Sequence, residues 1–153
     1  MRVAFAADHA GAALKDDLVR RLGAAGLGHE IADLGGDGSD PLDDYPEFAR
    51  RLGEAILAGE ADRGVLICGS GVGASVAANK MRRFRAAVCH DTYSAHQGVE
   101  HDDMNVLVLG GRIIGPALAH ELVEAFVKAR YTAEERHARR LAKVNAIEAR
   151  YSK

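Results

Sequence analysis

One stretch of the chain places a thiol directly before a glycine-rich loop. Cys68 closes an apolar run and is followed by GSGVGA, in which Gly69, Gly71 and Gly73 alternate with other residues. Successive backbone N–H groups in such a loop, with a helix starting behind them, attract a small anion. A thiol at this place can act as a base or nucleophile, whereas a buried cysteine elsewhere is usually a small core residue.

The loop has two further interpretations. It fits the dinucleotide fingerprint Gly-x-Gly-x-x-Gly/Ala, with Asp91 following after about twenty residues. It also fits a plain strand-to-helix turn that needs glycine for positive φ. The dinucleotide fingerprint normally occupies the first strand-to-helix turn, and a nucleotide site has no use for a thiol. The presence of Cys68 therefore favours a catalytic role for this loop over a nucleotide site. Cys89 has no glycines beside it and is expected to be a core residue.

Two histidines stand among acidic residues. His9 follows Asp8 in AADHAG and is either a substrate contact or a loop residue paired to its neighbour. His101 lies in EHDD, where nearby carboxylates favour a protonated imidazole that could act as a general acid. The alternative for His101 is a solvated acidic turn. None of the seven histidines shows a metal-binding spacing, so no metal site is predicted.

Three arginines could bind a phosphate. Arg136 and Arg140 are four residues apart and would share one face of a helix. Arg112 follows two glycines at the end of an apolar run. Guanidinium groups bind phosphate through paired, charge-assisted hydrogen bonds. The alternative is an ordinary solvated basic face.

The elements that must position these residues alternate along the chain. Hydrophobic periodicity and turn residues predict strands at 3–8, 29–35, 64–69, 85–91 and 105–111. Helices are predicted at 11–26, 45–59, 75–81, 92–101 and 115–131, with a last one running from a capping box at Thr132 and Glu135 to the C-terminus. This order predicts a parallel sheet with helices on both faces, and the apolar third, fourth and fifth strands suggest burial on both sides. Ligands bind such sheets at the carboxyl ends of the strands.

Composition limits the classes of function. The chain has 153 residues, of which 48% are hydrophobic and 27% charged, with a formal charge of −2. We expect one globular domain over 1–153, with no general attraction to nucleic acid or membranes. The apolar runs are too short to span a bilayer, the N-terminus does not resemble a signal peptide, and two cysteines do not make a disulfide scaffold. A cytoplasmic location is the expectation.

Several motifs together resemble a known family. AADHAG, DDYPEFA, ICGSGVGASVAANK, EHDDMNVLVLGGR and ERHARR follow one another over nearly the whole chain. They resemble the B-type ribose-5-phosphate isomerases, whose relatives act on allose and galactose 6-phosphates. The resemblance implies a Rossmann-like three-layer α/β/α sandwich with a five-stranded parallel sheet. It also implies a homodimer or tetramer with active sites at the subunit interface and no cofactor or metal, and the long C-terminal helix would suit such an interface.

The resemblance implies a role for each matching residue. Cys68 corresponds to the catalytic base, because Ala74 stands where other members carry a glutamate base. His101 corresponds to the residue that opens the sugar ring, assisted by Ser70. The residues implied to bind substrate are Asp8, His9, Tyr45, Gly69, Gly71, Val72, Gly73, Asp102, Arg112, Arg136 and Arg140.

The implied reaction interconverts ribose 5-phosphate and ribulose 5-phosphate through an enediolate. One position departs from the family: Asp102 stands where an asparagine usually binds substrate. An ionised carboxylate accepts hydrogen bonds but cannot donate them, and it opposes negative charge nearby. The departure leaves open an isomerase for another sugar phosphate, such as a tetrose, allose or galactose phosphate. A non-catalytic nucleotide-binding module is the more distant alternative.

Overall fold

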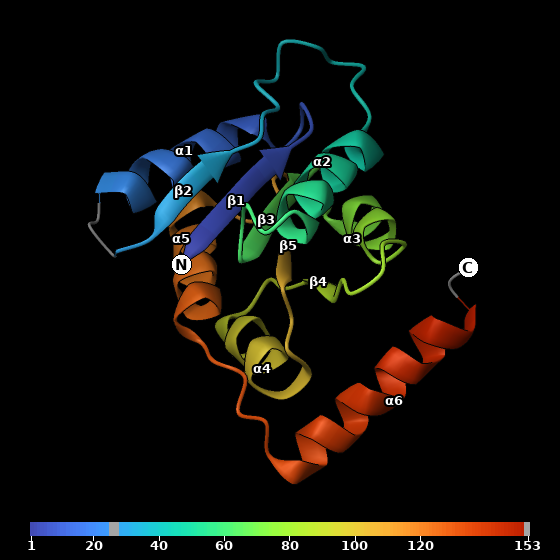
Figure 1. Cartoon of the computed structure of the whole chain (residues 1–153). Helices are drawn as coiled ribbons and strands as arrows, with labels where there is room; N and C mark the ends of the chain where they lie inside the picture. The colour runs from blue at the N-terminus through green and yellow to red at the C-terminus, as the bar shows by residue number, and fades with distance from the viewer. Residues whose placement is uncertain (25–27, 152–153) are drawn as a thin grey trace.

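The structure is a computed structural model that describes residues 1–24 and 28–151. Five strands form one parallel sheet in the order β2-β1-β3-β5-β4 (Figure 1). The strands are β1 (Arg2–Ala7), β2 (Glu30–Asp33), β3 (Arg63–Cys68), β4 (Ala86–Val88) and β5 (Val106–Gly110). The helices of the described residues are α1 (Ala12–Ala24), α2 (Tyr45–Leu57), α3 (Val72–Ala78), α4 (Thr92–Asp102), α5 (Pro116–Lys128) and α6 (Glu135–Tyr151).

Helices cover both faces of the sheet, as the alternating sequence pattern predicted. Leu18, Val99 and Phe126, from α1, α4 and α5, belong to one core cluster. Leu52 and Ala78, from α2 and α3, belong to a second cluster on the opposite face. Alternate residues of each central strand contribute to the two clusters, since successive side chains of a strand point to opposite faces. The predicted Rossmann-like α/β sandwich with a five-stranded parallel sheet is confirmed.

The prediction of burial on both faces holds only for the central strands. Every residue of β5 is buried, and so is all of β3 after Arg63. β4 was predicted to be equally buried, and this is wrong, because its three residues are only partly buried. β4 lies at the edge of the sheet and pairs with β5 alone. The apolar side chains of β4 are therefore only partly covered by the rest of the chain.

α3 and α6 begin at other residues than the sequence predicts. α3 begins at Val72 rather than at residue 75, because Gly71 has a φ of 85° and lets the chain turn directly from the glycine loop into the helix. The predicted end of the first helix at 25–26 and of the last helix at 152–153 lies outside the described residues. The capping box at Thr132 is wrong, since α6 begins at Glu135. The Thr132 hydroxyl instead binds the Glu100 carbonyl oxygen at 3.0 Å.

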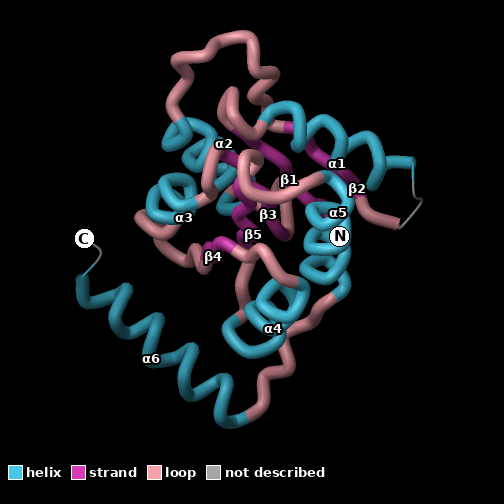
Figure 2. The backbone as a smooth tube through the Cα atoms, turned by 180° about the vertical axis from the view of Figure 1, so that it is seen from behind, coloured by secondary structure: helices cyan, strands magenta, loops and turns pink. Residues whose placement is uncertain are grey.

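α6 lies apart from the sheet in both views (Figures 1 and 2). Its one buried side chain is His137, near its start. Val144, Ile147 and Tyr151 are apolar or aromatic yet 49%, 61% and 72% exposed. The helix thus carries an apolar face that its own chain leaves largely open. Within the described residues, no helix is both long and apolar enough to cross a membrane.

The loop before α2 packs closely on the end of β1. Gly36 has a φ of 87°, and a Cβ built on it would lie 1.7 Å from the carbonyl oxygen of Ala7. The Ala7 N–H also donates to the Gly35 carbonyl oxygen at 3.2 Å. This contact fixes the start of the loop that leads to Tyr45.

Replacing Gly36 by alanine should therefore destabilise the protein. The left-handed backbone alone would cost about 1–3 kcal/mol, and the clash with Ala7 adds to it. Gly23 is the matched control, because it lies in α1 with no atom within 4 Å of its added Cβ. Gly23→Ala should raise stability by about 0.5–1 kcal/mol. Urea unfolding of both variants at one protein concentration checks the pair, and equal stability of the two would contradict this account.

Candidate active site

A cavity of about 370 Å³ opens at the carboxyl ends of the central strands. Cys68 lies at the end of β3 and is buried, while Asp8 follows β1 directly. The other lining residues come from the glycine loop, the start of α2 and the chain after β5. The full lining is Asp8, Tyr45, Cys68, Gly69, Ser70, Gly73, Arg112 and Ile113. The cavity thus brings together half of the predicted site residues, at one edge of the sheet.

The Cys68 sulfur contacts the glycine loop directly. The Gly71 N–H donates to Sγ at 3.2 Å. This contact holds the sulfur at the start of the loop. Ser70 and Val72 are exposed beside it, and the Val72 N–H lies 3.3 Å from the Ser70 hydroxyl oxygen. The loop therefore presents both a sulfur and a hydroxyl group to the cavity.

Arg112 is held against the glycine loop by backbone pairing. The Gly111 N–H donates to the Cys68 carbonyl oxygen at 2.8 Å, and the Arg112 N–H donates to that of Gly69 at 3.0 Å. These bonds continue the pairing of β3 with β5 beyond the strand ends. A Cβ added at Gly69 would lie 3.6 Å from Nη1 of Arg112, so the guanidinium group lies beside the loop.

Asp8 and His9 leave the end of β1 in a tight turn. Asp8 is 6% exposed, and its Oδ1 accepts the N–H groups of Ala10 and Gly11 at 3.0 and 3.1 Å. His9 is held by Asp43, whose Oδ1 lies 2.7 Å from Nδ1 of the ring. Asp8 thus lines the cavity as a fixed carboxylate, with His9 immediately after it.

Tyr45 forms one wall of the cavity against Gly73. A Cβ added at Gly73 would lie 2.7 Å from Cζ of the tyrosine ring. Tyr45 is the first residue of α2, and Pro46 occupies the first turn, where its missing N–H costs little. The ring packs flat on the loop only because position 73 has no side chain.

The remaining predicted residues lie around the end of α4 and the start of α6. The rings of His101 and His137 stack with their centroids 4.0 Å apart, and Nδ1 of His101 lies 2.7 Å from Nε2 of Gln97. Burial and the positive charges of His101, Arg136 and Arg140 lower the pKa of His137. Nδ1 of the His137 ring contacts the Thr132 hydroxyl at 2.9 Å. We call His101, Asp102, Arg136 and Arg140 the histidine cluster, and the residues around Cys68 the cysteine cluster.

Within one chain, the two clusters lie at opposite edges of the sheet. Cys68 pairs with Gly110 at the carboxyl end of β5, whereas His101 precedes Val106 at the amino end. The strand alone separates them by about 13 Å, at about 3.3 Å per residue. In Figure 1 the arrow of β1 points up towards the long loop before α2, while α4 and the start of α6 lie at the bottom. The structure therefore does not bring His101 to Cys68 within one chain.

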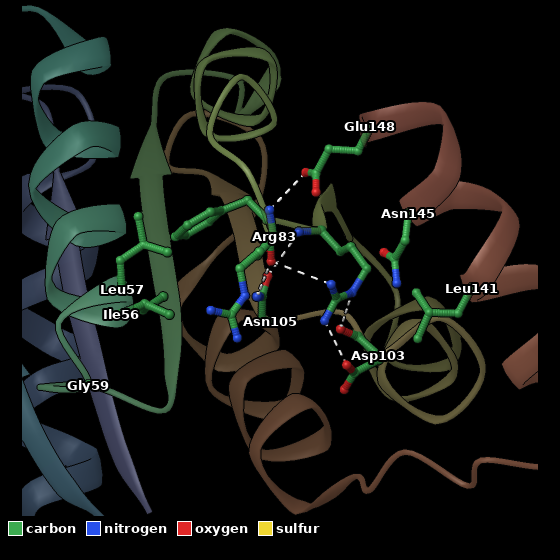
Figure 3. Close-up of a pocket in the computed structure, with 11 residues that line it drawn as sticks. Ile56, Leu57, Gly59, Arg83, Asp103, Asn105, Leu141, Asn145 and Glu148 are labelled. Carbon is green, nitrogen blue, oxygen red and sulfur yellow. Dashed lines mark hydrogen bonds and ion pairs between the residues drawn. The ribbon is translucent and has the colours of Figure 1, made fainter. Parts of the chain in front are cut away.

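A larger cavity of about 690 Å³ lies between α6 and the amino edge of the sheet (Figure 3). Both carboxylates in its lining are engaged: Glu148 accepts the backbone N–H of Arg83 at 2.8 Å, and Asp103 pairs with the Arg85 guanidinium at 2.6 Å. None of its lining residues belongs to the cysteine cluster or the histidine cluster. The cavity at Cys68 is therefore the better candidate site, although it is the smaller of the two.

Two observations bear on the alternatives raised by the sequence. The Asp91 carboxylate accepts the Ser94 N–H at 2.7 Å and caps α4, which lowers its pKa. It is therefore engaged as a helix cap rather than offered to a ribose, and this weakens the dinucleotide interpretation. Cys89 is buried in the core, where burial raises the pKa of its thiol to about 11. It remains a neutral thiol, unlike a catalytic base.

Sequence reasoning missed several residues that contact the predicted ones. Asp43, Gln97 and His137 hold His9 and His101 through hydrogen bonds or ring stacking. Gln97 lies four residues before His101, a helical spacing that could have suggested their contact. Asp43 is one of several acidic residues in a loop without periodicity, so no local signal distinguished it.

Known proteins resemble this chain over most of its length. Residues 3–144 match the family model described as Ribose/Galactose Isomerase. Ribose-5-phosphate isomerase B of Escherichia coli is 42% identical over 149 residues, with 97% of each chain covered. D-erythrulose-4-phosphate isomerase of Pectobacterium atrosepticum is 39% identical over 133 residues, covering 86% of this chain and 85% of that protein.

Solved structures show the same fold. The ribose-5-phosphate isomerase B of Clostridium thermocellum superposes with a TM-score of 0.91 at 42% identity, covering 99% of this chain and all of the other. Both the sequence match and the structural match extend over nearly the whole chain. The chain therefore belongs to the ribose/galactose isomerase family.

Proposed function

We propose that this protein interconverts ribose 5-phosphate and ribulose 5-phosphate through an enediolate. The observation that carries the proposal is the Cys68 thiol in the wall of a cavity that Asp8, Ser70 and Arg112 also line, with the Gly71 N–H on its sulfur at 3.2 Å. The names of the relatives support a sugar phosphate as substrate.

Cys68 acts as the base in this proposal. Its thiolate takes the proton from the carbon next to the carbonyl of the open-chain sugar, and the same sulfur returns it to the neighbouring carbon. Ala74, fully buried in the second core cluster, leaves no carboxylate at the place where other family members carry a base. A single base that carries a proton from one carbon to the adjacent one suits an isomerisation, because substrate and product contain the same number of protons.

The glycine loop stabilises the enediolate. Amide N–H groups between Gly69 and Gly73 would bind the negative oxygen that forms as the proton leaves, a contribution of about 3–4 kcal/mol per donor in similar sites. The tight packing of Gly71 and Gly73 keeps these groups in place before substrate arrives. Preorganised donors stabilise the transition state more than the ground state.

The phosphate and the closed sugar ring require the histidine cluster. His101, assisted by Ser70, opens the ring, while Arg112, Arg136 and Arg140 bind the phosphate. Since His101 and Cys68 lie at opposite edges of one sheet, we infer that a second copy of the chain supplies the histidine cluster to each cavity. The exposed apolar face of α6 would then be covered by that copy, in a homodimer or a tetramer.

The second candidate substrate is a four-carbon sugar phosphate. One relative, 39% identical, is named for D-erythrulose 4-phosphate. Asp102 is exposed at the last residue of α4, beside Asp103, whose carboxylate is paired with Arg85. A free carboxylate next to His101 suits a substrate that offers a hydroxyl donor there.

Replacing Cys68 by alanine should lower kcat about 10²–10⁴-fold with little change in substrate binding, because the base is lost and the cavity remains. Cys89→Ala is the control, since that thiol is buried away from the cavity, and it should keep its kcat. Turnover of ribose 5-phosphate is followed by NMR without added cofactor. Near-normal turnover by Cys68→Ala would refute the thiol base.

A mixture of two inactive variants should regain activity. Cys68→Ala and His101→Ala chains are unfolded together and refolded, so that mixed dimers form. A site shared between subunits gives one intact site in each mixed dimer, hence about a quarter of the wild-type activity in a random mixture. No recovery, despite mixed dimers seen by native mass spectrometry, would mean that the site is not shared.

Asp102→Asn should change the preference among sugars. An amide can donate a hydrogen bond to the developing enediolate, whereas a carboxylate cannot. We expect kcat/KM for ribose 5-phosphate to rise relative to that for a four-carbon sugar phosphate. The test compares kcat/KM over a panel of phosphorylated aldoses for both proteins, and an equal change for every sugar would contradict a role in specificity.

A further inference from the structure

We propose that Asp43 is a positioning residue that fixes the orientation and the protonated nitrogen of the His9 ring at the cavity. This inference rests on the function proposed above, together with the substrate contact that the family resemblance implies for His9. Neither His9 nor Asp43 lines the cavity, but His9 directly follows Asp8, which does. Asp43 lies beyond His9, so it would act through the His9 ring.

Asp43 binds His9 at two points with one oxygen. Its Oδ1 accepts the backbone N–H of His9 at 2.9 Å and lies 2.7 Å from Nδ1 of the ring. The two residues belong to different loops, one after β1 and one before α2. The contact is shielded, since the side chains are 15% exposed for Asp43 and 30% for His9. Such a long-range contact joins the two loops beside the cavity.

The chemistry of the two groups determines the tautomer. A carboxylate oxygen only accepts hydrogen bonds, so the nitrogen that faces it must carry a proton. Nδ1 of His9 is therefore the protonated nitrogen, and Nε2 is the one that remains to meet a ligand.

The backbone around His9 is already rigid. The carboxylate of Asp8 holds the next two N–H groups, those of Ala10 and Gly11. The Asp8 N–H donates to the Ile67 carbonyl oxygen at 3.2 Å, next to Cys68. What remains free is the rotation of the imidazole ring, and the contact with Asp43 restricts it. A side chain held in its binding orientation loses less entropy when substrate binds.

Asp43→Asn tests this role with the smallest change in shape. An amide offers either an oxygen or an NH₂ group to Nδ1, so it no longer dictates which ring nitrogen is protonated. We expect KM for ribose 5-phosphate to rise about tenfold, with kcat largely kept. In a His9→Ala background, Asp43→Asn should cause no further loss, because its effect passes through the ring.

Asp40→Asn is the matched control. Asp40 lies in the same loop and accepts the Leu42 N–H at 2.9 Å, without a contact to His9. This variant should keep the wild-type kcat/KM, and thermal melts of all variants check that they are folded. If Asp43→Asn lowers kcat/KM as much in the His9→Ala background as in the wild type, Asp43 only shapes its loop and the proposal is overturned.

A second measurement does not depend on turnover. Nitrogen-15 NMR of the imidazole shows which ring nitrogen of His9 carries the proton. We expect a protonated Nδ1 in the wild type and a mixture of tautomers in Asp43→Asn. An unprotonated Nδ1 in the wild type would overturn the inference. Absence of isomerase activity with a protonated Nδ1 would instead refute the proposed function and leave the positioning of the ring intact.

Discussion

The candidate site depends on backbone pairing that continues past the ends of β3 and β5. The hydrogen bonds from Gly111 to Cys68 and from Arg112 to Gly69 join the two loops that leave the sheet. This close approach is possible because Gly110 has no side chain: an added Cβ would lie 2.8 Å from the Ser70 carbonyl oxygen. The thiol, the amide donors and the arginine are thus anchored to the buried centre of the sheet. A site on such a rigid support can be preorganised in a way that a site on free loops cannot.

The same topology places the histidine cluster away from Cys68. A helix that follows a parallel strand starts at the carboxyl edge and must end at the amino edge before the next strand begins. α4 obeys this rule, so its last turn carries His101 away from Cys68. α6 then starts beside that turn, held by Thr132 and by the stacking of His137. Each chain thus carries the cysteine cluster at one edge of the sheet and the histidine cluster at the other. In the proposed assembly, a second copy supplies the histidine cluster to each cavity.

Much of the fold could be predicted from the sequence, because burial and turn residues act locally. Alternating apolar and helical patterns identified the strands and helices, and strand ends located the cavity at Cys68. The half-burial of β4 was missed, since an apolar edge strand has the same sequence pattern as a central one. The separation of His101 from Cys68 depends on the direction of α4 relative to the sheet, which a motif cannot reveal. The contact between Asp43 and His9 joins two loops, and no periodicity links them.

The packing of Tyr45 on Gly73 has a consequence for how the protein can change. The ring occupies the volume that any side chain at position 73 would need. A larger residue at position 73 becomes tolerable only after position 45 has become smaller, so the order of the two substitutions matters. The reverse order passes through a chain in which the cavity wall is displaced from the loop beside the thiol. Substitutions at the two positions are therefore coupled, and Gly73 cannot be replaced while Tyr45 is present.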